Sequence, residues 1–207
     1  MERLLREIER LKDSKIGGLV QGRMRDFEKL GKSSDEDIFK ELCFCILTAN
    51  YTAEGGIRVQ REIGDDFLTL PERELARQLK DLGYRFPNTR SKYIVEARKY
   101  KDSLKEIVNS KDEFQAREWL IRNVKGLGYK EASHLLRNIG FKGLAIIDFH
   151  IVDLLAKHEI IKKPKDMTNK KYLEIEGLLR DIADKANINL AELDLYLWYM
   201  ETGKVLK

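Results

Sequence analysis

The sequence predicts an all-α protein, and three observations lead to this fold class. Apolar residues recur at helical spacing almost throughout the 207 residues, and no run alternates with a period of two for long enough to suggest a strand. Hydrophobic residues make up 43% of the chain, which is ample for a buried core. The 3 prolines and 14 glycines are too few for a collagen-like or linker-rich chain.

The first half of the chain contains three clear helical segments. A short amphipathic helix is expected over residues 4–11, and a capping box at 33–36 opens a helix over 38–47. Because this second helix is apolar nearly all round, we expect it to be central and buried. A third helix begins near Pro71, where a missing N–H costs nothing, and stops at Gly83.

The second half is also helical, with a break at two glycines. A turn at 84–88 precedes the next helix, and Ser110 with Glu113 forms another capping box. Gly126 and Gly128 then interrupt the helical pattern. The helices expected in this half lie around residues 93–97, 114–120, 132–139, 151–155, 172–182 and 190–197.

Composition and charge exclude several classes of protein. No apolar run approaches the roughly 18 residues of a membrane-spanning helix, and no signal-like apolar segment follows the charged first residues, so we expect a cytoplasmic protein. Cys43 and Cys45 are too few for a Cys-ligated iron–sulfur cluster or a four-cysteine zinc site, and we interpret them as core residues. The net charge of +4 is compatible with nucleic acid without requiring it. Abundant Lys, Arg and Glu are typical of thermophile surfaces.

The most informative segment runs from Val124 to Lys130. Two glycines separated by one apolar residue, Gly126 and Gly128, allow a tight hairpin whose backbone N–H groups open the following helix. Such N–H groups, with the helix dipole behind them, bind phosphate without sequence preference. Between residues 122 and 142 five basic residues stand against one acidic residue, a local charge of +4. The alternative is an ordinary helix–turn–helix corner with solvated lysines.

Gly126-Leu127-Gly128 followed by Lys130, with Asp148 eighteen residues further on, resembles the helix–hairpin–helix DNA glycosylase superfamily. The resemblance is strongest to the archaeal 8-oxoguanine DNA glycosylases of the second Ogg type, and it covers essentially the whole chain. The loop before Asp148 departs from the superfamily pattern, because it is poor in glycine and proline. Further matching segments are 47–50, 84–86, 146–150 and 197–207.

The resemblance implies that Lys130 is the nucleophile and Asp148 its catalytic partner. A lysine amine can displace a base at the anomeric carbon and form a Schiff base with the opened sugar, which permits β-elimination and a strand nick. Asp148 would support the cationic, oxocarbenium-like sugar of the transition state. From the residues alone Asp148 is a helix N-cap, a role compatible with catalysis. Superfamily members that only remove the base typically lack this lysine, so Lys130 implies combined glycosylase and lyase activity.

The resemblance also implies how the duplex is held once the target base has left the stack. Asn50 would fill the space beside the orphaned cytosine. Arg85 would recognise that cytosine, and Phe86 would insert into the duplex as a wedge. Arg90 is a further candidate contact to that cytosine. The alternatives are that Asn50 caps a helix end and that Phe86 belongs to the core. The residues expected to contact the DNA backbone are Lys125, Gly126, Gly128 and His150.

Trp198 and Lys207 are the base-recognition residues that the resemblance implies. Trp198 offers a flat face for a stacked purine, although a lone tryptophan on a helix is more often part of the core. The carboxylate of Lys207 would accept the N7–H that 8-oxoguanine has and guanine lacks. This mismatch discriminates strongly, because guanine would leave a buried acceptor unpaired. Of the other histidines, we interpret His134 and His158 as structural or surface residues.

No cofactor, catalytic metal or iron–sulfur cluster is expected. The resemblance implies only a structural monovalent cation at the backbone carbonyls of Arg122, Val124 and Leu127. The expected partner is duplex DNA containing 8-oxoguanine opposite cytosine, bound by a monomer that does not contact membranes. We expect two helical subdomains with the active site in the cleft between them, one formed by 1–32 with 134–207 and the other by 33–133, which ends in the helix–hairpin–helix near 114–139.

Three other functions stay open at this point. A glycosylase for oxidised pyrimidines, resembling endonuclease III, is disfavoured because the C-terminal cysteine cluster is missing, although a cluster-free variant would fit. In a non-catalytic helix–hairpin–helix DNA-binding module, a Lys130→Gln change would merely weaken binding and reduce its salt dependence. A helical partner-binding protein would show no salt-dependent affinity for DNA. The enzyme is favoured, because the lysine, aspartate, wedge and C-terminal candidates all fit one DNA-repair site.

Overall fold

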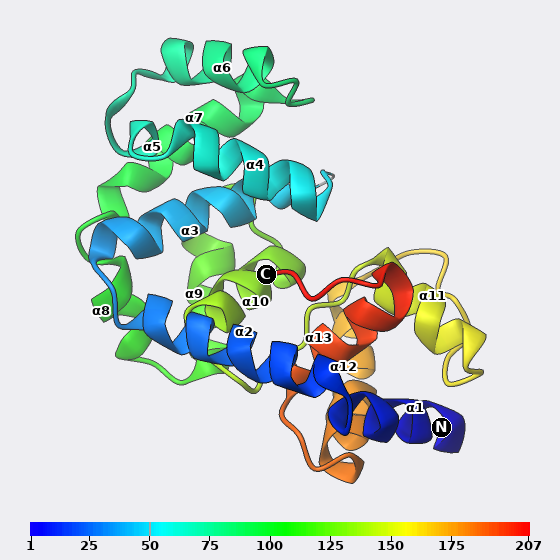
Figure 1. The fold of residues 1–207 in the computed structure, drawn as a ribbon. Coiled ribbons are helices and arrows are strands. Elements are labelled where there is room, and N and C mark those ends of the chain that lie inside the picture. The colour runs from blue at the N-terminus through cyan, green and yellow to red at the C-terminus, as the bar shows by residue number, and fades with distance from the viewer. Residues whose placement is uncertain (50) are drawn as a thin grey trace.

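Figure 1 shows the computed structural model, which describes residues 1–49 and 51–207. All regular structure in these residues is helical, which confirms the predicted all-α fold. The elements are α1 (Glu2–Lys12), α2 (Lys15–Gly31), α3 (Asp35–Thr48), α4 (Ala53–Ile63), α5 (Asp66–Thr69), α6 (Glu72–Asp81), α7 (Pro87–Ala97), the 3₁₀ helix η1 (Arg98–Tyr100), α8 (Leu104–Asn109), α9 (Glu113–Asn123), α10 (Tyr129–Asn138), α11 (Phe149–Lys157), α12 (Asn169–Lys185) and α13 (Leu190–Thr202).

Helix α3 lies at the centre of the first of two hydrophobic clusters, as its all-round apolar sequence predicts. Every residue from Glu41 to Thr48 is buried. Side chains from α4 through α10 complete this cluster, which extends as far as Leu144. The predicted insertion residue Asn50 follows α3 and lies outside the described residues.

The second cluster joins the two ends of the chain. Helices α1 and α2 pack there with α11, α12 and α13. After Phe27 the next residue of this cluster is Ala145, which directly follows Leu144, the last residue of the first cluster. Helix α2 serves both, because Val20, Met24 and Phe27 lie in the second cluster whereas Leu30 packs against the first. In Figure 1 α2 accordingly runs from one group of helices to the other.

Two segments outside the helices also cross between the clusters. One is the loop from α10 to α11, which contains Leu144 and Ala145. The other is the tail after α13, which returns toward α3 and α10 (Figure 1) and ends with Lys207 bonded to Glu41. The predicted subdomain boundary at residue 133 stays a prediction. The side chains of α10 beyond it, such as Leu135, pack in the first cluster.

The structure corrects two predicted caps. The N-cap of α3 is Ser34, whose side chain accepts a hydrogen bond from the Asp37 amide, rather than Ser33 in a box with Glu36. Likewise Asp112 and not Ser110 caps α9. In both places several capping residues follow one another, and the oxygen that reaches an amide three residues later decides which of them is the cap.

Helices α2 and α4 were not anticipated from the sequence. Each contains two adjacent glycines, which lower helix propensity and obscure the apolar spacing. In α2, Gly17 allows close packing, because a Cβ there would lie 2.2 Å from the carbonyl oxygen of Lys12. Among the described residues, none of the helices combines the length and apolarity needed to cross a lipid bilayer.

Candidate active site

The predicted hairpin joins α9 to α10 in a turn that requires glycine. Gly126 has φ +88°, in the left-handed region. A Cβ at this position would lie 2.6 Å from Cδ2 of Tyr93 and 2.9 Å from Nη1 of Arg90. The turn closes with a backbone hydrogen bond from Leu127 to the carbonyl of Val124. The glycine spacing noted in the sequence therefore sets both the backbone conformation and the packing on α7.

Lys130 lies in the first turn of α10, directly after the hairpin. Its Nζ is 3.2 Å from Oε1 of Glu131, and its side chain is 26% exposed. The other carboxylate oxygen of Glu131 accepts a hydrogen bond from the amide of Gly128, the N-cap residue. The start of α10 thus holds the lysine amine at a defined place while leaving it accessible.

Asp148 is the N-cap of α11, which confirms the local structure predicted for it. Its Oδ1 accepts a hydrogen bond from the amide of Ile151 at 3.0 Å. One small pocket of about 70 Å³ is lined by both Asp148 and Lys130. The complete lining comprises Thr48, Tyr51, Ala53, Lys130, His134, Arg137, Ile146, Asp148, Asp194, Trp198, Leu206 and Lys207.

This inner pocket opens into a wider outer cleft of about 790 Å³. Lys130, Asp148 and Trp198 line both spaces. Arg85 and His150 line only the outer cleft. The nucleophile, aspartate and base-recognition residues predicted from the sequence therefore meet at one site, with two of the predicted DNA contacts at its mouth.

An aromatic path leads from the pocket to the surface. The ring of His150 lies edge-on to Trp198 with centroids 5.0 Å apart, and Phe149 lies 3.9 Å from His150 on its other side. Phe149 is 66% exposed at the cleft and was not singled out in the sequence. A large aromatic residue directly after the N-cap aspartate was the sequence signal that could have found it.

The other predicted DNA contacts lie in different settings. Phe86 is 37% exposed beside the guanidinium of Arg85, so it does not belong to the core. Arg90 is buried and donates to the carbonyl of Ala49 at 3.3 Å, which ties α7 to the end of α3. Lys125 is exposed and pairs with Glu96 at 2.9 Å.

The charge excess expected around the hairpin is largely neutralised in the fold. Lys142 pairs with Glu28 from α2, as Lys125 does with Glu96 from α7. Arg137 is buried and pairs with Asp194 at 2.7 Å, so it is not part of a basic surface. A local charge count along the sequence misses these partners because they come from distant segments.

A buried polar chain underlies the pocket, and sequence reasoning missed most of it. The ammonium of Lys207 contacts Oε2 of Glu41 at 2.7 Å and the side chain of Gln60. The other oxygen of Glu41 accepts from Asn138, which in turn accepts from Nε of Arg137. Glu41 is a charged residue that directly precedes the apolar run 42–47 of α3, a signal that could have marked it.

Asp194 stands at the end of this chain. Burial raises its pKa to about 6, and the nearby charge of Asp148 acts in the same direction, whereas Arg137 opposes the shift. Burial likewise lowers the pKa of Arg137. Asp194 therefore places a carboxylate in the pocket wall, and burial makes the ionised form of this carboxylate energetically unfavourable.

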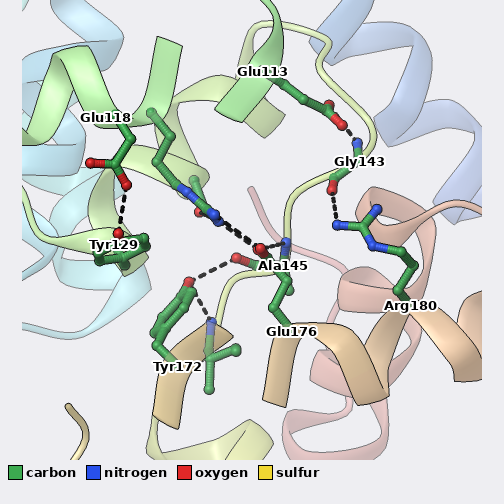
Figure 2. Close-up of polar contacts among 11 residues, drawn as sticks. Glu113, Glu118, Tyr129, Gly143, Ala145, Tyr172, Glu176 and Arg180 are labelled. Carbon is green, nitrogen blue, oxygen red and sulfur yellow. Dashed lines mark hydrogen bonds and ion pairs between the residues drawn. The ribbon is translucent and has the colours of Figure 1, made fainter. Parts of the chain in front are cut away.

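Figure 2 shows a second buried ion pair, which fixes the loop that carries Asp148. Arg117 of α9 bonds both carboxylate oxygens of Glu176 of α12, at 2.5 and 2.9 Å. Glu176 also accepts a hydrogen bond from the amide of Ala145. The Tyr172 hydroxyl donates to the carbonyl of Ala145 and accepts from the amide of Ile147. We call these five residues the loop clamp.

The loop clamp has further supports on both sides (Figure 2). Glu113 accepts from the amide of Gly143, and Arg180 donates to the carbonyl of the same residue. Tyr129, which precedes the lysine, donates to Glu118. The start of α10 and the loop leading to α11 are thus held by one continuous set of contacts.

The described residues include two thiols and side chains of the types that bind metal ions. Among residues 1–49 and 51–207, no group of three or more His, Cys, Asp or Glu side chains is arranged to hold a metal ion. Cys43 and Cys45 are free and buried in α3, and burial raises the pKa of both thiols well above the ordinary value. They are core residues rather than nucleophiles.

A hairpin lysine that shares a pocket with the N-cap aspartate of the next helix is the arrangement that the resemblance to helix–hairpin–helix DNA glycosylases implies. A family model described as 8-oxoguanine DNA glycosylase matches residues 20–188. The chain belongs to this family.

Relatives of known name cover almost the whole chain. The 8-oxoguanine DNA glycosylase/AP lyase of Korarchaeum cryptofilum is 55% identical over 99% of this chain and 98% of its own length. That of Methanocaldococcus jannaschii is 55% identical over 99% of both chains.

Solved structures give the same result. The M. jannaschii 8-oxoguanine glycosylase/lyase in complex with a 15mer DNA containing 8-oxoguanine superposes with a TM-score of 0.96, at 55% identity over 99% of this chain and 100% of that one. The Thermotoga maritima 8-oxoguanine DNA glycosylase superposes with a TM-score of 0.93 at 48% identity, over 100% of this chain and 99% of that one.

Proposed function

We propose that this protein is a bifunctional DNA repair enzyme that extrudes and excises 8-oxoguanine from duplex DNA and then nicks the strand. The observation that carries this proposal is that Lys130 and Asp148 line one pocket together with Trp198. A flipped base in the pocket would stack on the indole. The wide outer cleft would accommodate the adjoining sugar and phosphates.

The residues present account for each step of the chemistry. The Nζ lone pair of Lys130 attacks C1′, and the base leaves with the electrons of the glycosidic bond and gains a proton that the amine releases. Opening of the sugar ring, in which O4′ gains the second proton of the amine, gives a Schiff base between Nζ and C1′. Water accepts a C2′ proton as the 3′ phosphate leaves by β-elimination, and a further water hydrolyses the Schiff base to release the lysine. The carboxylate of Asp148 stabilises the positive charge on the sugar in the first step.

The finer recognition roles belong to the same proposal. Lys207 lines the pocket while Glu41 and Gln60 hold its ammonium, so a carboxylate on this residue would face the N7–H of the base. Arg85, Phe86 and Asn50 would serve the strand opposite the lesion, where we expect cytosine, and Arg90 would support them through the end of α3. We expect the protein to act as a monomer in the cytoplasm, on chromosomal DNA.

The phosphate-binding hairpin would also accept a monovalent cation. Among the described residues, the carbonyls of Arg122 and Leu127 accept no backbone hydrogen bond, and that of Val124 accepts one. Neutral backbone carbonyls are ligands that such cations use in proteins. A cation held there would bind a DNA phosphate beside the amides of Gly126 and Gly128, with Lys125 and His150 as further backbone contacts.

Borohydride trapping tests the proposed reaction. The protein is incubated with an 8-oxoguanine·cytosine duplex and borohydride, alongside Lys130→Gln and the surface control Lys171→Gln, and products are separated on a denaturing gel. We expect a covalent adduct for wild type and Lys171→Gln and none for Lys130→Gln, because borohydride links protein to DNA only by reducing a Schiff base between them.

Other results would separate the alternatives. An adduct on a duplex with an oxidised pyrimidine and none on 8-oxoguanine would indicate an endonuclease III-like specificity. Salt-dependent binding without any adduct or base release would indicate a passive binding module, and Lys130 would then be a phosphate contact.

A further inference from the structure

His134, which the sequence suggests is a structural or surface histidine, lines the inner pocket. It lies one helical turn after Lys130 on α10, so the two side chains share one face of the helix. The residue is only 8% exposed and lines the inner pocket. Its Nε2 is buried and has no hydrogen-bond partner among the described residues. A buried polar atom of this kind calls for a partner, and the pocket is where one can enter.

The surroundings of His134 keep its ring neutral. Burial lowers its pKa well below the ordinary value, and the charges of Arg137, Lys130 and Lys207 act in the same direction. The main-chain oxygen of Lys207 opposes this shift as a hydrogen-bond acceptor for the ring. The ring also packs edge-on against Phe44, with centroids 5.5 Å apart.

A neutral imidazole carries one N–H and one bare lone pair. Since Nε2 has no partner and the main-chain oxygen of Lys207 acts on the ring as an acceptor, we assign the ring N–H to Nδ1. The lone pair is then on Nε2, the nitrogen without a partner. His134 therefore presents a hydrogen-bond acceptor to whatever enters the inner pocket.

We propose that His134 is a base-recognition residue whose Nε2 accepts a hydrogen bond from an N–H of the extruded base. The inference rests on the proposed function and adds a recognition group to its pocket. Guanine-type bases carry N–H donors at N1 and the exocyclic amine, and 8-oxoguanine has a further one at N7. A base that offers no donor at this point would leave Nε2 buried and unpaired, which disfavours its binding.

Two substitutions test the role of Nε2. His134→Phe keeps an aromatic ring against Phe44 but removes the acceptor, whereas His134→Gln places an amide oxygen near the position of Nε2. Each variant is measured in two single-turnover reactions. One is base excision from an 8-oxoguanine·cytosine duplex, and the other is strand cleavage at a preformed abasic site, which contains no base for His134 to contact.

We expect His134→Phe to slow excision by about tenfold or more, consistent with the loss of one buried hydrogen bond. His134→Gln should recover most of that loss. Abasic-site cleavage should stay within about twofold of wild type in both variants, because Lys130 and the backbone contacts are unchanged. Excision that falls alone, with recovery by Gln, supports the proposal.

Two results would overturn the role of His134. Unchanged excision in His134→Phe would show that Nε2 makes no contact that matters. A parallel loss of excision and abasic-site cleavage would show a merely structural role. The wild-type reactions separate this from the proposed function: a wild type that cleaves abasic sites but leaves 8-oxoguanine in place contradicts the proposed substrate itself.

Discussion

Two buried arginine–carboxylate pairs lie near Lys130 and Asp148 and differ in their hydrogen-bond partners. In the loop clamp, Arg117 contacts both oxygens of Glu176, and the carboxylate has a further donor in the amide of Ala145. Below the pocket, Arg137 contacts Asp194 through one pair of atoms. Both arginines are almost completely buried.

The difference indicates what each pair does. In the loop clamp both oxygens of Glu176 are bonded within the protein, and Nε of Arg117 is the clamp's buried atom without a partner among the described residues. The clamp thereby fixes the loop that carries Asp148. The region under the pocket retains polar atoms without protein partners, at Nε2 of His134 and Nε1 of Trp198. Unpaired polar atoms reduce stability, and they are also the atoms available to a ligand. The unpaired atoms of His134 and Trp198 belong to residues that line the pocket, whereas Arg117 is not among the lining residues.

The largest expected effect comes from breaking the loop clamp. Glu176→Gln leaves the guanidinium of Arg117 buried without an anionic partner, and we expect the free energy of unfolding to fall by about 3–5 kcal/mol. Urea unfolding at pH 7 measures this change. The control Glu174→Gln removes an exposed carboxylate from the same helix and should leave stability almost unchanged. Equal effects in the two variants would contradict the role of the clamp.

The second prediction concerns pH and the pocket pair. The folded pKa of Asp194, about 6, lies above its ordinary value of 3.8, so between these values the folded protein binds more protons than the unfolded chain. The contribution of Asp194 to the free energy of unfolding is therefore present at low pH and is lost as pH rises to 6, by about 3 kcal/mol in total.

Asp194→Asn should remove that dependence. Urea unfolding at intervals from pH 4 to 7 would show the stability of wild type falling relative to the variant as pH rises. Burial also shifts the pKa of His134, but this histidine is present in both proteins and its contribution cancels in the difference. Parallel stability curves for the two proteins would show that Asp194 titrates normally.

The smallest expected effect comes from a single hydroxyl of the loop clamp. Tyr172→Phe leaves the carbonyl of Ala145 and the amide of Ile147 without their shared partner, at a cost of about 1–3 kcal/mol. Tyr84→Phe is a matched change in the first cluster, where the hydroxyl donates to the carbonyl of Leu47. Thermal unfolding should show a larger decrease for Tyr172→Phe. The reverse order would indicate that the loop is not held by this hydroxyl.

Much of the fold followed from local pattern. The central burial of α3, the hairpin at Gly126 and the capping role of Asp148 were all predicted, because each depends on neighbours a few residues away. Helices α2 and α4 were missed, since adjacent glycines weaken the local signal and packing against distant helices compensates for them.

The site followed from sequence only in part. Lys130 and Asp148 stood out through a motif, and they meet at one pocket. Glu41, His134 and Asp194 did not stand out, because an ionisable residue on a helix is usually solvated. Their segments lie far apart in the chain, and the burial that makes them important arises only when α3, α10 and α13 converge.

The sequence by itself determined the helical fold class, the hairpin turn and the residue types needed for Schiff-base chemistry, because periodicity, capping and glycine conformation act over a few residues. Only the tertiary structure decided which side chains surround the lysine. It buried Arg137 away from the expected basic surface and left Nε2 of His134 without a partner inside the pocket. The reason is physical: desolvation and pairing depend on what lies within a few ångströms in space, whatever the separation along the chain.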